Sequence, residues 1–336
     1  MKKYRWGIIG TAKIARSAMI PALKDSAMAE VVAVASRDSS RARNFADELG
    51  IAQAYGSYQT MLDEAEIDAV YIPLPNHLHK VWTIRAAEAG KHILCEKPLA
   101  LNPDECREMI AAAKKNGIVL MESFMYRYHP RIKAAREMVQ SGAIGSVKTI
   151  QSALTFYLEN QQDFRLFPEM GGGALMDVGC YCINISRLIA EKEPVTVHAR
   201  AVWTKTGVDE QLVAILDFGD GLIAHFDCAF NMEQRQHCVI SGTKGYLSLP
   251  RPFNPGKAET QLFEEKGLGN SKVHIFAGVN DYRLIAEDFM QSISSGVPAF
   301  PIEDSVANMQ VMQALVTSAK NNGNPVDLYT AAYNTH

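Results

Sequence analysis

Long hydrophobic runs are missing from this chain of 336 residues, since no apolar stretch approaches the roughly 20 residues that a membrane-spanning helix requires. The basic N-terminus, Met1–Arg5, leads into a short strand-like run. It lacks the apolar segment and the small-residue cleavage site of a secretory signal. We therefore expect a cytoplasmic protein that does not bind membranes.

A charge excess of one sign is also missing. The formal net charge is -3, and no run of like charges occurs. Nucleic-acid-binding domains carry a basic patch or stripe, so nucleic acid is not an expected partner.

Cysteine is sparse, and its spacing does not suggest a disulfide framework. The six cysteines are scattered at positions 95, 106, 180, 182, 228 and 238. Cys180 and Cys182 form a CxC pair that is compatible with metal binding, but no further His or Cys lies nearby at zinc spacing. We expect two small apolar residues in a buried helix and no metal site.

What the sequence does contain is enough apolar residues, 47%, for a substantial core. The length suggests about two domains, with the boundary placed between residues 1–123 and 124–336. The first part alternates short apolar strands with helical patterns, which predicts a doubly wound parallel sheet. The expected strands are Trp6–Ile9, Val31–Ala35, Ala69–Ile72, His92–Cys95 and Val119–Met121, and the expected helices are Arg41–Leu49, His77–Ala89 and Pro103–Asn116.

After about residue 124 the pattern changes to longer strands with fewer helices, which predicts an α+β domain with an open, mostly antiparallel sheet. Gly219-Asp220-Gly221 is a hairpin turn signal between two of these strands. The expected strands are Val147–Leu158, Val195–Trp203, Gln211–Phe218, Leu222–Phe230 and His237–Ser241. The expected helices are Pro130–Gln140, Gly173–Ala190, Asp281–Ser294 and Asp304–Asn321.

The first strand runs into Gly10-Thr11-Ala12-Lys13-Ile14-Ala15 and then into a helix. This resembles the G-x-G-x-x-G/A turn that holds a dinucleotide pyrophosphate at a helix N-terminus. Gly10 suits the tight turn and Ala15 suits close packing, whereas Ala12 replaces the middle glycine. We predict dinucleotide binding by Gly10, Thr11, Ala12 and Ile14.

The end of the second strand indicates which dinucleotide is bound. NAD-binding units place an acidic residue there, but this chain has Ser36, followed by Arg37 and, one turn further, Arg41. Guanidinium groups suit the 2′-phosphate of NADP, so we predict NADP over NAD. Two alternatives are an ordinary surface arginine at position 37 and a ribose contact from Asp38.

Two sequence runs carry a family resemblance. One extends from Pro75-Asn76-His77-Leu78-His79 to Glu96-Lys97-Pro98, and the other is Gly171-Gly172-Gly173 through Asp177 to Tyr181. In order and spacing the chain resembles the Gfo/Idh/MocA family of oxidoreductases. The run from Met121 to Pro130 is similar to the branch that contains dimeric dihydrodiol dehydrogenases, NADP-dependent D-xylose dehydrogenases and keto-sugar reductases.

The resemblance implies a Rossmann domain and a C-terminal domain whose last helix packs back on the first domain. It also implies a homodimer or homotetramer formed through the open sheet. The substrate class that it implies is a sugar, a related polyol or a diol.

For catalysis the resemblance places Lys97 beside the nicotinamide, with Tyr181 as proton donor and acceptor. A phenol has an ordinary pKa of about 10, which a nearby ammonium lowers. Asp177 lies four residues before Tyr181 on the same helical face, where it would orient the lysine or hold a substrate hydroxyl. A solvated surface lysine and a core tyrosine are the alternatives.

Further contacts are expected around these residues. Asn76 would either cap the following helix or touch the cofactor or substrate. One of the nearby histidines would also touch the cofactor or substrate. Arg127 and Arg165 are cationic candidates for the substrate and the nicotinamide end, or else form an interdomain salt bridge. The remaining predicted cofactor contacts are Pro73, His79 and Glu96.

Two other function classes fit the same fold. One is an NADP-binding sensor without catalysis, because a fold does not establish a chemistry. The other is a glycosidase of the same family that uses the nicotinamide transiently.

Overall fold

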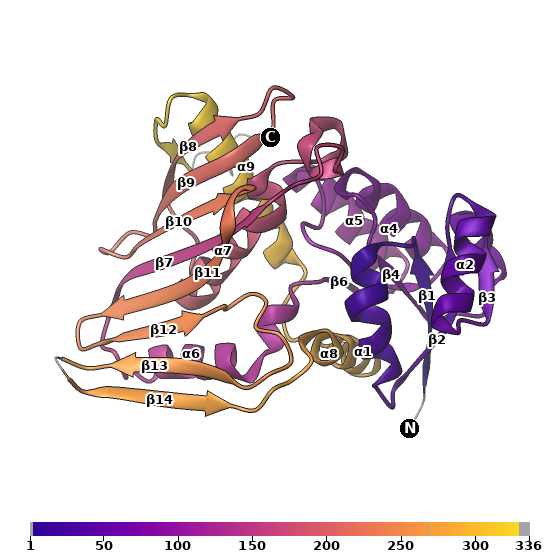
Figure 1. Cartoon of the computed structure of the whole chain (residues 1–336), viewed down its shortest axis with the longest axis horizontal. Helices are drawn as coiled ribbons and strands as arrows, with labels where there is room; N and C mark the ends of the chain where they lie inside the picture. Colours follow the sequence, from indigo (N-terminus) through magenta and orange to yellow (C-terminus); the bar gives the residue numbers. More distant parts are fainter. Residues whose placement is uncertain (1–2, 268, 329–336) are drawn as a thin grey trace. The chain divides into compact units, whose positions relative to one another are not determined.

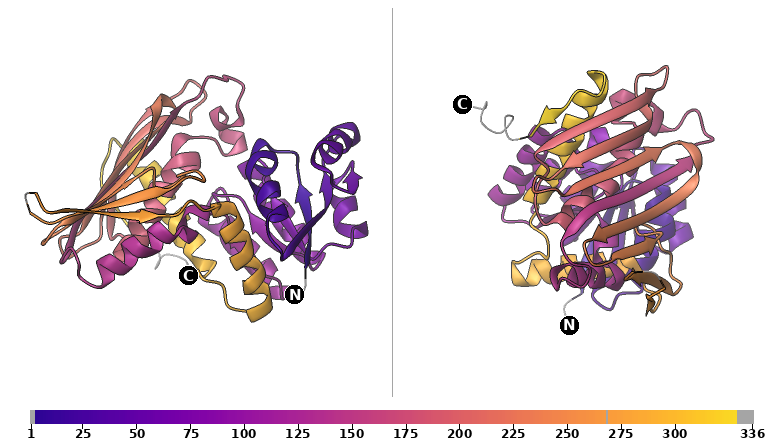
Figure 2. Two further views of the ribbon diagram at one scale, coloured as in Figure 1. Left: turned by 60° about the horizontal axis from the view of Figure 1, so that its bottom comes forward. Right: turned by 90° about the vertical axis from the view of Figure 1, so that its left-hand side faces the viewer.

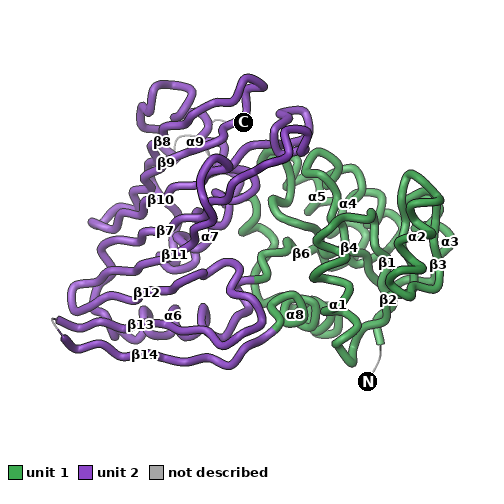
Figure 3. Tube along the Cα trace, in the orientation of Figure 1, with its two compact units in different colours: residues 1–125, 280–306 green, residues 126–279, 307–336 purple. Residues whose placement is uncertain are grey.

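The computed structural model describes residues 3–267 and 269–328, and its Cα trace divides into two compact units (Figure 3). The first unit comprises the residues up to 125 together with 280–306. The second unit comprises 126–279 and the residues from 307 onward. Within the described ranges, no helix combines the length and apolar character needed to cross a membrane.

The first unit contains a six-stranded parallel sheet in the order β3-β2-β1-β4-β5-β6 (Figure 1). The strand order reverses beside β1, where open α/β sheets bind their ligands at the carboxyl ends of the strands. The strands are β1 (Tyr4–Ile9), β2 (Ala29–Ala35), β3 (Gln53–Tyr55), β4 (Ala69–Ile72), β5 (His92–Cys95) and β6 (Leu120–Glu122).

Strands of this sheet are apolar because helices cover both faces. The predicted doubly wound sheet is confirmed, although β3 was missed because its three residues include an exposed glutamine. The helices are η1 (Ala15–Met19), α1 (Ile20–Lys24), α2 (Ser39–Leu49), α3 (Tyr58–Glu64), η2 (Asn76–Leu78), α4 (His79–Glu88) and α5 (Pro103–Lys115). The predicted helix cap at Asn102 is present, since its side chain accepts a hydrogen bond from Glu105 N.

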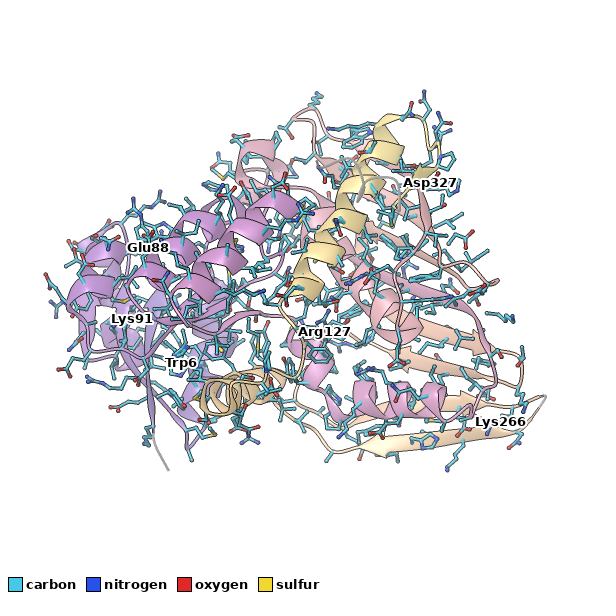
Figure 4. The ribbon with its side chains drawn as sticks, turned by 180° about the vertical axis from the view of Figure 1, so that it is seen from behind. Trp6, Glu88, Lys91, Arg127, Lys266 and Asp327 are labelled. Atoms are coloured by element: carbon cyan, nitrogen blue, oxygen red, sulfur yellow. The ribbon has the colours of Figure 1, made fainter. Side chains whose placement is uncertain are left out.

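Helix α8 (Asp281–Ser295) belongs to the first unit although it follows the second sheet in the chain. The indole ring of Trp6, labelled in Figure 4, lies 5.3 Å from the ring of Phe289 on α8. The Tyr4 hydroxyl lies 2.7 Å from Ser294 Oγ. Most of the last helix, α9 (Glu303–Lys320), belongs to the second unit, where the Ser318 hydroxyl accepts from Ala199 N.

The second unit contains a nine-stranded sheet in the order β14-β13-β12-β11-β7-β10-β9-β8-β15. Its pairs are antiparallel except for β7 with β10, so the predicted open, mostly antiparallel sheet is confirmed. The strands are β7 (Val147–Tyr157), β8 (Thr196–Trp203), β9 (Asp209–Asp217), β10 (Ile223–Ala229), β11 (Asn231–Gly242), β12 (Tyr246–Pro250), β13 (Thr260–Glu265), β14 (Ser271–Phe276) and β15 (Val326–Asp327).

One face of this sheet is covered and the other is open. The π-helical turn η6 (Leu175–Gly179) continues into α7 (Cys180–Ala190) and packs on β7, β9 and β10, while α6 (Pro130–Gln140) packs on β13. Cys180 and Cys182 are buried in α7, as predicted. No helix lies over the opposite face in the right-hand view of Figure 2.

Candidate active site

Gly10 ends β1 with a positive φ of 113°, in the region that favours glycine. A Cβ atom there would lie 2.9 Å from Leu74 Cδ2, so the turn also brings the chain after β4 close to β1. Ala15 is fully buried, which confirms its predicted packing role. Thr11, Ala12 and Ile14 are partly exposed at the start of the following helix. Ile14 precedes η1 and offers no side-chain acceptor, while Arg16 N already donates to the Ala12 carbonyl oxygen at 3.2 Å. Any anion at this helix start would therefore be met by the N–H groups before Arg16.

After the end of β2, the acidic Asp38 and the basic Arg37 and Arg41 have different surroundings. Asp38 is the N-cap of α2, and its carboxylate accepts a hydrogen bond from Arg41 N at 3.0 Å. Its place as a helix cap therefore argues against the alternative of a ribose contact. Arg37 and Arg41 are exposed, and both lower the pKa of the Tyr58 phenol, although burial raises it overall. Two guanidinium groups and a phenol thus gather beside the buried Ser36.

Asn76 and His79, two residues predicted to contact the cofactor, follow β4 and have surroundings that the sequence did not predict. Asn76 does not cap α4, because the N-cap residue is Leu78 and a 3₁₀ turn intervenes, so that alternative is wrong. His79 is fully buried, with Nδ1 2.9 Å from the Pro98 carbonyl oxygen and Nε2 2.8 Å from that of Leu74. Burial lowers the pKa of the imidazole, although its contacts with the Pro98 and Leu74 carbonyl oxygens act in the opposite direction. The side chain of His79 therefore supports the loop from inside the domain, where the sequence had predicted a contact with the cofactor.

Lys97 follows the carboxyl end of β5, and its side chain is partly exposed. The Lys97–Pro98 peptide bond is cis. The loop is held on either side of Lys97: Glu96 accepts from the Tyr71 hydroxyl at 2.6 Å, and Leu99 N donates to Glu122 Oε1 at 2.8 Å. Burial raises the pKa of the Glu96 carboxyl, although the Lys97 ammonium and Tyr71 act in the opposite direction. These contacts hold the loop that carries Lys97 after the carboxyl end of β5, the edge at which open α/β sheets bind ligands.

In the second unit, Arg165 links two carboxylates. Its Nε donates to Asp177 Oδ2 at 2.6 Å, and its Nη1 donates to Asp163 Oδ1 at 3.1 Å. Burial disfavours the guanidinium charge, but the two carboxylates outweigh this and raise the pKa of Arg165. Because these partners lie within the second unit, this ion pair is not the interdomain salt bridge considered from the sequence.

Tyr181 lies in the first turn of α7 within an aromatic group, defined here as Tyr126, Tyr181 and Phe253. The Tyr181 ring centroid lies 5.9 Å from that of Tyr126 and 5.5 Å from that of Phe253. The residue is buried, with 7% exposure, so packing holds the ring in place.

Asn184, one turn after Tyr181, fixes the segment before α6. Its Oδ1 accepts from both the Tyr126 hydroxyl and Arg127 Nε, each at 2.6 Å. Arg127, labelled in Figure 4, is thereby tied to the helix that carries Tyr181.

The structure gathers the predicted residues into two groups, one in each unit. Residues from Gly10 to Lys97 lie along the carboxyl edge of the first sheet, and Arg127, Arg165, Asp177 and Tyr181 lie around the start of α7. Sequence reasoning missed Asn184 and Phe253, which contact Arg127 and Tyr181, and Asp209, which accepts from Leu175 N at the start of the same helix. Of these three, only the contact of Asp209 had a signal in the sequence. No Ser, Thr, Asp or Asn precedes the helix that begins after Gly173, so its first N–H groups need an acceptor from elsewhere.

A glycine turn at the switch point of a 3-2-1-4-5-6 sheet, together with a lysine after the carboxyl end of β5, defines a Rossmann-type domain suited to a dinucleotide. Residues 4–124 match the GFO/IDH/MocA family, described as an oxidoreductase family with an NAD-binding Rossmann fold. Residues 132–248 match the GFO/IDH/MocA C-terminal domain. The chain therefore belongs to the GFO/IDH/MocA oxidoreductase family.

Proteins similar to this chain include dehydrogenases and a ketoreductase. D-xylose 1-dehydrogenase (NADP(+)) 2 from Haloferax volcanii is 37% identical over 94% of this chain and 97% of its own length. A trans-1,2-dihydrobenzene-1,2-diol dehydrogenase from Xenopus laevis is 35% identical over 73% of this chain and 75% of its own. A solved 3-ketoreductase from Actinomadura kijaniata, in complex with NADP and TDP-benzene, superposes with a TM-score of 0.89 at 30% identity, covering 94% of this chain and 98% of the other.

Proposed function

We propose that this chain is an NADP-dependent oxidoreductase that transfers a hydride to or from a hydroxyl-bearing or carbonyl carbon of a sugar or related diol. The observation that carries the proposal is the position of Lys97, directly after β5 in a loop held by Glu96 on one side and Glu122 on the other. Family membership and relatives that act on D-xylose and a dihydrodiol support the same reaction class.

The residues along the first sheet fit NADP. The positive φ at Gly10 disfavours any other residue, and the start of the following helix has no side-chain cap, which suits a pyrophosphate. Arg37 and Arg41 would hold the 2′-phosphate beside Ser36. Pro73, Asn76 and Glu96 line the same carboxyl edge and would lie near the nicotinamide end.

When bound, NADP would supply or accept the hydride, and the chain's own residues would handle the proton and the charge. Reduction of a carbonyl builds negative charge on its oxygen, which a hydrogen-bond donor or a cation must stabilise. In this proposal the Tyr181 hydroxyl donates its proton to that oxygen, and the Lys97 ammonium stabilises the resulting phenolate. In oxidation the same proton returns to Tyr181.

Asp177, Arg165 and Arg127 would then shape the substrate-facing side. Asp177 has carboxylate oxygens able to accept from sugar hydroxyls, and its ion pair with Arg165 holds it in place. Substrates rich in hydroxyl groups suit such a surface, which agrees with the relatives' reactions.

We also infer that the chain forms a homodimer or homotetramer through the open face of the second sheet. On β9 the buried Leu212, Ala214 and Leu216 alternate with the exposed Val213 and Ile215. Exposed apolar side chains continue on the neighbouring strands at Val202 and Ile223. Polar residues lie among them, because Arg200 and Asp227 are the neighbours of Val213 across the sheet. The open face thus combines exposed apolar and charged side chains, as protein–protein contacts commonly do.

Turnover of Lys97→Met tests the proposed reaction. The wild-type enzyme is incubated with NADP and a panel of aldoses and diols, and NADPH formation is followed by absorbance. We expect Lys97→Met to lose most turnover, on the order of 100-fold or more, while NADPH still binds with fluorescence enhancement. Lys115→Met, at an exposed lysine on α5, is the matched control and should keep wild-type rates.

Three outcomes would contradict this proposal in different ways. Wild-type turnover in Lys97→Met would remove the assigned catalytic residue. NADPH binding without turnover of any substrate in the panel would favour a sensor. Release of an aglycone from a glycoside, with no net change in NADPH, would favour the glycosidase alternative.

A further inference from the structure

The helix that carries Asp177 and Tyr181 begins without a capping residue of its own. Gly171–Gly173 precede it, and its N-cap residue, Ala174, makes no side-chain hydrogen bond. The first N–H groups of a helix have no partner within the helix, and a buried N–H group needs one. Gly173, Ala174 and Leu175 are buried, so these groups require an acceptor from elsewhere.

Asp209, the first residue of β9, supplies this acceptor from 34 residues further along the chain. Its Oδ2 accepts from Leu175 N at 2.7 Å, and the carboxylate also accepts from Ala174 N. The side chain is buried, with the residue 4% exposed. Asp209 therefore acts as a helix cap donated by the sheet, in a place usually filled by a local Ser, Thr, Asp or Asn.

The glycine run is shaped around this carboxylate. Gly173 has a φ of 118°, and a Cβ atom there would lie 2.3 Å from Asp209 Oδ1. Gly173 N also donates to the carbonyl oxygen of Arg165 at 2.9 Å. The start of the helix is thus held between β9 on one side and the Arg165 segment on the other.

Asp209 has no opposite charge to account for its burial. Over residues 3–267 and 269–328, no lysine or arginine forms an ion pair with it. Its electrostatic support comes from the two N–H groups and the positive end of the helix dipole. Burying a carboxylate costs free energy unless hydrogen bonds offset the lost hydration. At Asp209 these hydrogen bonds come from the helix start, so the same contact places the helix.

We propose that Asp209 is a positioning residue, which fixes the start of the η6–α7 helix and thereby the placement of Asp177 and Tyr181. This inference rests on the proposed function, because the helix matters for turnover only if these two residues take part in it. A misplacement of about 1 Å at a reacting group can reduce the rate about 100-fold.

Paired substitutions on the same strand test this role. Asp209→Ala removes the acceptor, and Asp209→Asn keeps one carbonyl oxygen for Leu175 N. Asp217→Ala, at the other end of β9, removes a comparable bond, in which Asp217 Oδ1 accepts from Gly219 N at 2.8 Å. We expect kcat to fall by at least about tenfold in Asp209→Ala, less in Asp209→Asn, and not in Asp217→Ala. The Kd of NADPH should stay unchanged in all three.

Amide hydrogen exchange provides a second measurement that is independent of turnover. Exchange at Ala174 and Leu175 should accelerate in Asp209→Asn relative to Asp217→Ala, and it can be measured even where Asp209→Ala folds poorly. Wild-type kcat in Asp209→Ala, or equal losses in Asp209→Ala and Asp217→Ala, would overturn the positioning role.

Tyr181→Phe distinguishes this failure from failure of the proposed function. If Tyr181→Phe loses turnover and Asp209→Ala does not, only the positioning role is refuted. If Tyr181→Phe turns over like the wild type, the proposed function fails and the role of Asp209 fails with it.

Discussion

The guanidinium of Arg165 and the carboxylate of Asp177 form an ion pair with a distance of 2.6 Å between Nε and Oδ2. This pair lies within the second unit, so Asp177 has a cationic partner without any contribution from Lys97. The proposed role of Asp177 is accordingly that of an oriented acceptor, with Arg165 as the group that orients it.

Removing the charge of Arg165 is expected to impair both turnover and stability. The Arg165 and Asp177 side chains are only 28% and 14% exposed, so Arg165→Met leaves the Asp177 carboxylate without its partner and should lower the free energy of unfolding by about 1–3 kcal/mol. Its kcat should fall about tenfold, because the Asp177 carboxylate loses its orienting partner. Arg136→Met, which breaks the surface pair with Glu191, is the control. Equal kcat values in the two variants would contradict the role given to Arg165.

Substitution of both Arg37 and Arg41 by alanine is expected to reverse the cofactor preference. Each charge-assisted hydrogen bond to a phosphate contributes about 1.5–3 kcal/mol, so the Kd of NADPH should rise at least about 10-fold. The Kd of NADH should change little. Arg43→Ala, at an exposed position on the same helix, should leave both values unchanged. A parallel weakening of NADPH and NADH would count against a 2′-phosphate site.

His79→Ala is expected to loosen the Lys97 loop from the turn after β4. The fully buried imidazole contacts the carbonyl oxygens of Pro98 and Leu74, and its loss leaves both acceptors without that partner. We expect the free energy of unfolding to drop by about 1–3 kcal/mol, together with a lower kcat. His77→Ala is the control for stability, because Nδ1 of His77 is buried without a hydrogen-bond partner among the described residues. Similar urea midpoints for the two variants would refute the supporting role of His79.

Asp209 is expected to make stability depend on pH. Burial raises the pKa of its carboxyl to about 7, although the backbone N–H groups of Leu175 and Ala174 act in the opposite direction. The nearby thiol of Cys228 has a pKa raised by burial and stays neutral. Because the unfolded carboxyl titrates near 3.9, the native state binds the extra proton between about pH 4 and pH 7.

Stability should therefore decrease as pH rises through this window, by up to about 1.4 kcal/mol per pH unit from this group. In Asp209→Asn that contribution is absent, so the difference between wild type and variant should change with pH in urea denaturation. Parallel pH profiles for the two proteins would show that Asp209 titrates normally.

Charged residues on the open sheet face are expected to dissociate the proposed oligomer. Val213→Lys combined with Ile215→Glu places two charges on β9, where these side chains are 48% and 45% exposed. Adding charged side chains to a buried contact incurs a desolvation cost, so light scattering should report monomers. Val297→Lys, at a 73% exposed position in the first unit, should keep the wild-type mass. An unchanged mass for the β9 variant would exclude this face as the contact.

The sequence by itself determined the local parts of this protein. Strand β1 and the turn at Gly10 follow from an apolar run and a glycine, and four of the remaining strands of the first sheet were predicted within a few residues for the same reason. Strands β12–β14 were missed, since their mixed polar character gives little periodic signal. Lys97 and Tyr181 could be named because the sequence around each resembles a family motif.

Only the tertiary structure decided which side chains support these residues. His79 precedes Pro98 by 19 residues, and Asp209 follows Leu175 by 34 residues, so no local pattern relates them. Their contacts arise because β-sheet pairing and helix packing bring distant segments together. A buried polar atom takes whichever partner the fold places within hydrogen-bonding distance, and sequence spacing carries no information about that choice.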